Sequence, residues 1–126
     1  MKRKEIAYVH SEAYAAGELK HGPISLIEQD TLVIALATME ALFEKTLSNM
    51  EEVKARGAHV LAVTTEETAG KLKKAADRVI LVPKTHPLLQ PSLSVIPLQI
   101  FSYYVALKRG CDVDKPRNLA KSVTVE

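Results

Sequence analysis

The first residues whose types could do chemistry are Lys2 and Glu5, in the stretch KRKEIAYVH. If Lys2 to Tyr8 is helical, the two side chains lie three residues apart on one face. There the glutamate could remove a proton from a carbon next to a carbonyl, while the lysine stabilises the developing oxyanion. The alternative is a solvated ion pair that contributes at most a few tenths of a kcal/mol. This stretch alone favours the ion pair.

His21 is the second candidate, in the stretch GELKHGP. Gly22 and Pro23 follow it and predict a turn. An imidazole titrates near neutral pH and could act as an acid or a base. A histidine at a turn is also commonly just solvated, and the heptamer alone does not decide between the two.

Motifs for metal and phosphate binding are missing from the sequence. His10, His59 and His86 have no partner at metal-ligand spacing, and HxH, HExxH and CxxC do not occur, so we expect no metal. GxGxxG and GxxxxGK[ST] are absent too. Thr64 and Thr65 end an expected strand and could bind an anion where the next helix begins. A threonine cap is the better interpretation of that pair.

Composition excludes several classes of protein. Hydrophobic residues make up 47% and charged residues 25%, as in an ordinary globular domain. Lys and Arg number 17 against 15 Asp and Glu, a balance that argues neither for nor against a nucleic-acid partner. No dense basic run appears, and we expect no nucleic-acid partner. The single Cys111 excludes an internal disulfide and is compatible with a reducing cytoplasm. No apolar run reaches the roughly 18 residues of a membrane span, and the N-terminus is not a signal peptide.

Three apolar runs predict the strands that position these residues. They cover Thr31 to Ala37, Ala58 to Thr65 and Arg78 to Pro83. The first two are continuous and rich in β-branched residues, which is typical of parallel strands buried on both faces.

A helix is expected after the first run. Its apolar residues recur at helical spacing, Thr38 is a plausible N-cap, and Gly57 lies where a C′ glycine belongs. Met39 and Met50 are expected to fill the core.

Two further helices are expected downstream. A short one lies around Thr68 to Ala76. A longer one follows, with Ser94 as a possible N-cap and Pro97 in its first turn, where proline is tolerated. Tyr103 and Tyr104 are expected to pack on this helix.

Alternating strands and helices predict a three-layer α/β/α fold with a parallel sheet. Three strands are fewer than such sheets usually have. The chain therefore looks like a domain without its first strand, with a polar tail from Cys111 to Glu126. A missing strand leaves an apolar sheet edge, so we expect association with a second copy or a partner.

Motifs at both ends of the chain resemble the glutamine–fructose-6-phosphate aminotransferases, also called glucosamine-6-phosphate synthases. They are AYAAGELKHGP and DVDKPRNLAKSVTVE, and SNMEEVKARGAHVLAV and PLQIFSYYVALKRG also fit. The resemblance covers essentially all 126 residues. It implies the second sugar-isomerase (SIS) subdomain, of flavodoxin-like or Rossmann-like type, over residues 1–110. Residues 111–126 would form a tail that contributes to the sugar site.

The resemblance also implies roles for single residues. Glu5 matches the base that moves a proton between C1 and C2 of the sugar, and Lys2 matches the lysine that assists it. His21 matches the histidine that opens the sugar ring, reaching the site from the neighbouring subunit. Lys121 matches the lysine that forms a Schiff base with the ketose, and Ala120 matches a backbone contact to the sugar. Met1 and Arg3, beside Lys2, depart from the family's usual neighbours.

The family enzyme has parts that this chain lacks. The glutaminase domain and the first SIS subdomain, with its phosphate-holding loop, are both absent, and Cys111 does not match the glutaminase nucleophile. We therefore expect partnership with those domains, a cytoplasmic homodimer, no cofactor, and no turnover by the chain alone. Two alternatives are a non-catalytic SIS-type module that binds sugar phosphate or supports assembly, and a truncated gene product with a structural role.

Overall fold

The computed structural model describes residues 7–115. Two compact units make up the chain. The larger unit is Tyr14–Val95, and the described part of the smaller one is residues 7–13 and 96–115.

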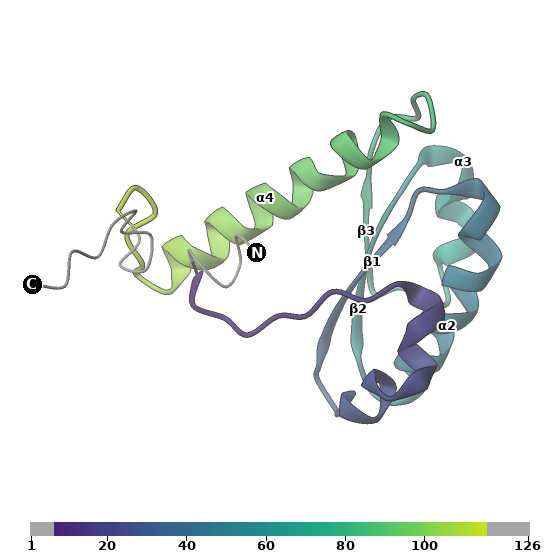
Figure 1. Cartoon of the computed structure of the whole chain (residues 1–126), viewed down its shortest axis with the longest axis horizontal. Coiled ribbons are helices and arrows are strands. Elements are labelled where there is room, and N and C mark those ends of the chain that lie inside the picture. The colour runs from purple at the N-terminus through teal and green to yellow at the C-terminus, as the bar shows by residue number, and fades with distance from the viewer. Residues whose placement is uncertain (1–6, 116–126) are drawn as a thin grey trace, which may run out of the picture. The chain divides into compact units, whose positions relative to one another are not determined.

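A parallel sheet of three strands, in the order β1-β2-β3, forms the centre of the larger unit (Figure 1). The strands are β1 Leu32–Ala37, β2 His59–Thr64 and β3 Arg78–Leu81. Leu32 pairs with His59 and Leu61 pairs with Arg78, which sets the register of both ladders. The predicted α/β fold with a parallel sheet is confirmed, and each strand is slightly shorter than its apolar run.

Helices connect the strands as predicted, although several begin elsewhere. The longer ones are α2 Phe43–Ala55 and α4 Gln90–Lys108, and α3 Glu66–Ala69 is short. Short 3₁₀ turns complete the order: η1 Ala16–His21, η2 Pro23–Leu26, η3 Glu40–Leu42 and η4 Gly70–Leu72. The predicted helix around Thr68 to Ala76 thus begins earlier and ends at Leu72.

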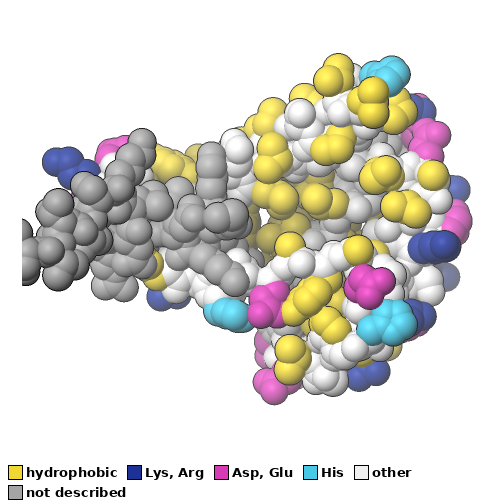
Figure 2. All heavy atoms as spheres, viewed as in Figure 1, with side chains coloured by type: hydrophobic (Ala, Val, Ile, Leu, Met, Phe, Trp, Pro, Cys, Tyr) yellow, Lys and Arg dark blue, Asp and Glu magenta, His cyan; other side chains and the backbone are white. Residues whose placement is uncertain are grey.

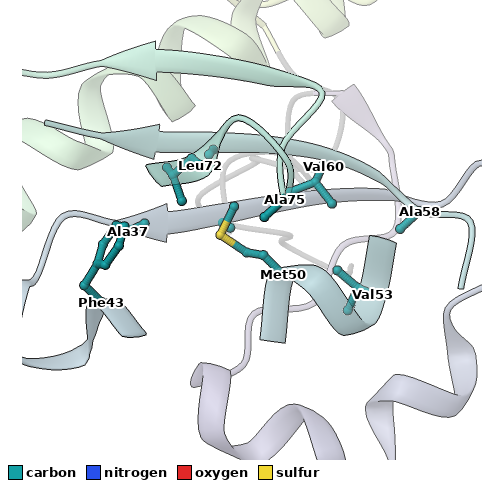
Figure 3. Packing of buried hydrophobic residues seen from close by; sticks show 10 residues of the cluster. Ala37, Phe43, Met50, Val53, Ala58, Val60, Leu72 and Ala75 are labelled. Carbon is teal, nitrogen blue, oxygen red and sulfur yellow. The ribbon is translucent and has the colours of Figure 1, made fainter. Parts of the chain in front are cut away.

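Helix α2 packs on one face of the sheet, on the same side as α3 (Figure 1). Phe43, Met50 and Val53 of α2 form the core with small residues of the strands and with Leu72 (Figure 3). Alanines at Ala35 and Ala62 leave space at the surface of the sheet for these larger side chains.

The other face of β1 is not covered by the larger unit's own packing. Leu32 and Leu36 are 40% and 47% exposed, so the prediction that this strand is buried on both faces is wrong. Among the described residues, no strand pairs with the outer edge of β1. Figure 2 shows apolar side chains gathered in the middle of the visible face of this unit, with charged ones toward its rim.

Two predicted caps, Thr38 and Ser94, are wrong because neither residue lies at the start of a helix. The Oγ1 of Thr38 lies 3.2 Å from the Oγ of Ser94, so the two hydroxyls bond to each other. Helix α2 begins five residues after Thr38, and α4 begins four residues before Ser94. Pro97 therefore lies in the interior of α4.

Of the predictions for Gly57, Met39 and Met50, two are confirmed and one is wrong. Gly57 has a φ of 91° and ends α2 as predicted. Met50 is buried as expected, but Met39 is 53% exposed, so its assignment to the core is wrong.

Candidate functional site

His21 is the one predicted site residue within the described part of the chain, and it lies at the end of η1. Gly22 follows with a φ of 143°, a conformation that favours glycine, and Pro23 starts η2. The Oγ of Ser25 donates a hydrogen bond to the Gly22 carbonyl at 2.6 Å, and its N–H bonds to the same oxygen. The turn at His21, Gly22 and Pro23 is thus built from local hydrogen bonds, as the Gly-Pro pair predicts.

The turn around His21 is attached to the core on both sides. Leu19 before it and Ile24 after it pack against the core cluster. The Nζ of Lys20 lies 2.5 Å from a carboxylate oxygen of Glu52 on α2. The imidazole itself is exposed. A fixed backbone with a free imidazole suits a group that exchanges a proton with a molecule bound from outside.

The other predicted site residues lie outside the described residues. These are Lys2, Glu5, Ala120 and Lys121. Nearby, Ala7 is helical, and Tyr8 has a φ of 51°, so helical backbone does not extend through Tyr8. The geometry of the complete predicted set therefore stays a prediction.

A second group of polar residues lies where the parallel strands end, which is the usual ligand-binding side of such sheets. Lys84 follows β3, and its Nζ lies 2.6 Å from Glu40 and 2.7 Å from Glu67. The Lys84 ammonium lowers the pKa of Glu40, mainly through this hydrogen bond. The two carboxylates in turn raise the pKa of Lys84 above its usual range. The cation is thus already shared between two anions.

Hydroxyl groups beside this cluster are also satisfied. Thr64 donates to the Ala37 carbonyl at 2.8 Å and contacts Thr68 at 2.7 Å. Thr65 occupies the N-cap position of α3, as predicted, although its side chain makes no capping hydrogen bond. Since these hydroxyls bond to one another, the strand ends do not present the open set of donors that a phosphate requires.

The smaller unit carries a shallow hollow of about 360 Å³. It is lined by residues from the two ends of the described chain: Tyr8, Arg109, Gly110, Cys111, Asp112 and Lys115. Cys111 is half-buried there and forms no disulfide. Three of these lining residues, Cys111, Asp112 and Lys115, belong to the tail predicted over residues 111–126.

Across residues 7–115, no group of three or more His, Cys, Asp or Glu side chains is arranged to hold a metal ion. In that range no helix has the length and hydrophobicity needed to cross a membrane.

Comparison with known proteins identifies the family. The model of the SIS domain family matches residues 1–109. The chain belongs to the SIS domain family.

Curated relatives of this SIS chain extend well beyond it. The glutamine–fructose-6-phosphate aminotransferase of Clostridium tetani is 62% identical over 126 residues, and that of Thermus thermophilus is 56% identical. In both cases the match covers 100% of this chain and 21% of the relative. The SIS chain thus spans about a fifth of the length of the curated relatives it matches.

A solved structure supports the SIS fold over most of the chain. The C-terminal domain of the aminotransferase from Francisella tularensis matches with a TM-score of 0.86 and 39% identity. The match covers 91% of this chain and 32% of the other.

The sequence of the SIS chain predicted a site residue at His21 and did not predict the cluster of Glu40, Glu67 and Lys84. Each of these three residues lies a few positions after the end of a strand. In a parallel sheet those positions meet at one edge, so the strand pattern contained the needed signal. Which charges pair there could not be read from the sequence.

Proposed function

We propose that this chain is the second SIS part of the isomerase half of a glutamine–fructose-6-phosphate aminotransferase. In the complete enzyme, fructose 6-phosphate and ammonia from glutamine give glucosamine 6-phosphate, a step of amino-sugar synthesis. The observation that carries the proposal is the 62% identity over all 126 residues, because it includes both ends that hold the predicted site residues.

The proposed roles follow the chemistry of the conversion. His21 opens the sugar ring, Lys121 forms an imine with the ketose, and Glu5 moves the proton between C1 and C2 with help from Lys2. The backbone of Ala120 contacts the sugar. The exposed imidazole of His21, on a turn attached to the core, fits its role.

We infer that the chain depends on partners for this activity. The glutaminase and first SIS domains of the complete enzyme would supply ammonia and the phosphate site. The satisfied hydroxyls and shared Lys84 at the strand ends agree with a phosphate held elsewhere. A cytoplasmic homodimer, with a sugar phosphate as ligand and no nucleic acid or membrane, completes the proposal.

The test is a complete polypeptide in which this chain replaces the matching segment of the Clostridium tetani relative. We expect glucosamine 6-phosphate from fructose 6-phosphate and glutamine. His21→Asn keeps the approximate size of the side chain but removes the imidazole that would transfer the proton. Its turnover should fall by roughly 10²–10⁴-fold, the usual contribution of an acid-base group.

The matched control is His86→Asn, at an exposed histidine in the loop before α4, and its turnover should stay unchanged. Equal turnover in both variants would remove His21 from the mechanism. A folded chimaera that binds fructose 6-phosphate but forms no product would favour the non-catalytic binding module instead.

A further inference from the structure

The segment that carries His21 has little apolar attachment to the larger unit. His21 ends η1, a 3₁₀ helix of six residues in which no residue is buried. Helices of this type have poorer hydrogen-bond geometry than α-helices and occur in short pieces. Of residues 16–21, Leu19 alone packs against the core cluster. The position of η1 therefore depends on the few other contacts that it makes.

The local hydrogen bonds of the turn do not fix where η1 lies. They run between residues 15–27 and include both bonds from Ser25 to the Gly22 carbonyl. Such bonds set the shape of the segment, but they do not attach it to another element. A contact with a distant part of the chain is needed to hold the turn in one place.

One polar contact of this kind joins η1 to α2. The Nζ of Lys20 lies 2.5 Å from a carboxylate oxygen of Glu52. Within residues 16–21, all of which the structure describes, no other side chain forms an ion pair or hydrogen bond with another element. Glu52 is next to Val53, which is 1% exposed in the core, so its backbone is held firmly. The pair thus fastens η1 to a helix that the core keeps in place.

The geometry of a 3₁₀ helix relates this contact to the direction of the imidazole. With 3.0 residues per turn, successive side chains are about 120° apart around the axis. Leu19, Lys20 and His21 therefore lie on three different sides of η1. Leu19 packs on the core, Lys20 pairs with α2, and the imidazole is exposed. The first two contacts set the rotation of η1 about its axis, and that rotation directs the third side chain.

We propose that Glu52 is a positioning residue for His21 and acts through Lys20. This inference rests on the proposed function, in which His21 opens the sugar ring. Glu52 itself does not touch the sugar. The ion pair keeps η1 in one orientation against α2, so that the imidazole is held where it exchanges a proton with the bound sugar. A misplacement of about 1 Å at a catalytic group can cost on the order of 10²-fold in rate, so a modest displacement of η1 is sufficient.

The experiment uses the complete polypeptide in which this chain replaces the matching segment of the Clostridium tetani relative. Glu52→Ala removes the carboxylate and leaves a residue that favours the helix. Glu44→Ala is the matched control. Glu44 lies on the same helix and its carboxylate is 3.7 Å from the Nζ of Lys71, but Lys71 belongs to η4 and not to the turn at His21.

Glu52→Ala should lower kcat by about 10-fold, less than the loss of the imidazole itself, and leave KM nearly unchanged. Glu44→Ala should change neither constant. Lys20→Met should reproduce the loss, and Lys20→Arg, which keeps the cation, should recover most of it. Because exposed ion pairs contribute little to stability, the melting temperatures of the Glu52→Ala and Glu44→Ala polypeptides should agree.

A double substitution shows whether Glu52 acts through His21. In the His21→Asn polypeptide, adding Glu52→Ala should cause no further loss of turnover, because the group that Glu52 positions is already gone. A further loss of about 10-fold in that background would mean that Glu52 acts elsewhere and would overturn the inference. Equal kcat values for Glu52→Ala and Glu44→Ala would overturn it too.

A measurement without turnover separates this inference from the proposed function. In the 126-residue chain, ¹⁵N relaxation gives the order parameter of the His21 amide, which is about 0.85 for rigid backbone. The value should be lower in Glu52→Ala than in Glu44→Ala or the unchanged chain. An inactive chimaera, or full turnover after His21→Asn, counts against the proposed function. The order parameter then decides alone, and an equal value in all three chains would show that the pair does not hold the turn.

Discussion

At the scale of single residues, Gly57 shows how closely the end of α2 is fitted. Its φ of 91° lies in the left-handed region that residues with a Cβ rarely adopt. A Cβ at this position would overlap the side chain of Gln29 and lie 3.3 Å from its Cα. The backbone conformation and the lack of space beside Gln29 thus both require glycine. The turn at Gly57 also sets where β2 begins.

We predict that Gly57→Ala destabilises the chain by at least about 1–2 kcal/mol, the cost of left-handed backbone alone. Gly70→Ala is the matched control. Gly70 has helical backbone and open space around it, so this change should stabilise by about 0.5–1 kcal/mol. Urea unfolding of both variants provides the measurement. A Gly57→Ala midpoint equal to the wild type would show that the turn relaxes without cost.

At the scale of elements, Asp77 connects two strands and a helix. It lies just before β3, accepts a hydrogen bond from the Val60 N–H of β2, and pairs with Lys54 of α2. The hydrogen bond from Lys54 lowers the pKa of Asp77 most, and the hydrogen bond from the Val60 N–H lowers it further. Its carboxylate is therefore favoured in the folded state.

We predict that the effect of Asp77→Asn depends on pH. Because folding lowers the pKa of Asp77, its carboxylate stabilises the fold above the unfolded value of about 3.9, and this is lost as pH falls through the folded pKa. Asp77→Asn should lower the urea midpoint at neutral pH, and the difference from wild type should shrink below about pH 4.

Glu28→Gln, on the exposed segment before β1, is the control for a lost surface charge and should show a smaller difference. A difference between wild type and Asp77→Asn that persists unchanged into acid would mean that shape or hydrogen bonding, rather than charge, explains it.

The elements also show what local sequence can predict. Continuous apolar runs predicted all three strands, although only β2 is largely buried among the described residues. The starts of α2 and α4 were missed because Thr38 and Ser94 are each plausible caps locally, yet their hydroxyls bond to each other. A contact between residues so far apart in sequence leaves no local pattern.

At the scale of the whole molecule, the candidate site was also predictable only where local sequence defines it. The turn at His21 was predictable because Gly22 and Pro23 define it locally. The family resemblance, rather than any local pattern, predicted which other residues act with it. The proposed function assigns the ammonia supply and the phosphate site to parts of the polypeptide outside this chain.

This dependence predicts how activity divides between the chain and the complete polypeptide. The chain alone should form no glucosamine 6-phosphate from fructose 6-phosphate with glutamine or ammonia, because remote phosphate binding positions the reacting carbons. In the complete chimaera, Lys121→Ala should keep sugar-phosphate binding and lose most turnover, since it removes the imine-forming amine. Lys73→Ala, at an exposed lysine of the larger unit, should change neither. Product from the chain alone would show that it holds a complete site, and unchanged turnover of Lys121→Ala would exclude the imine.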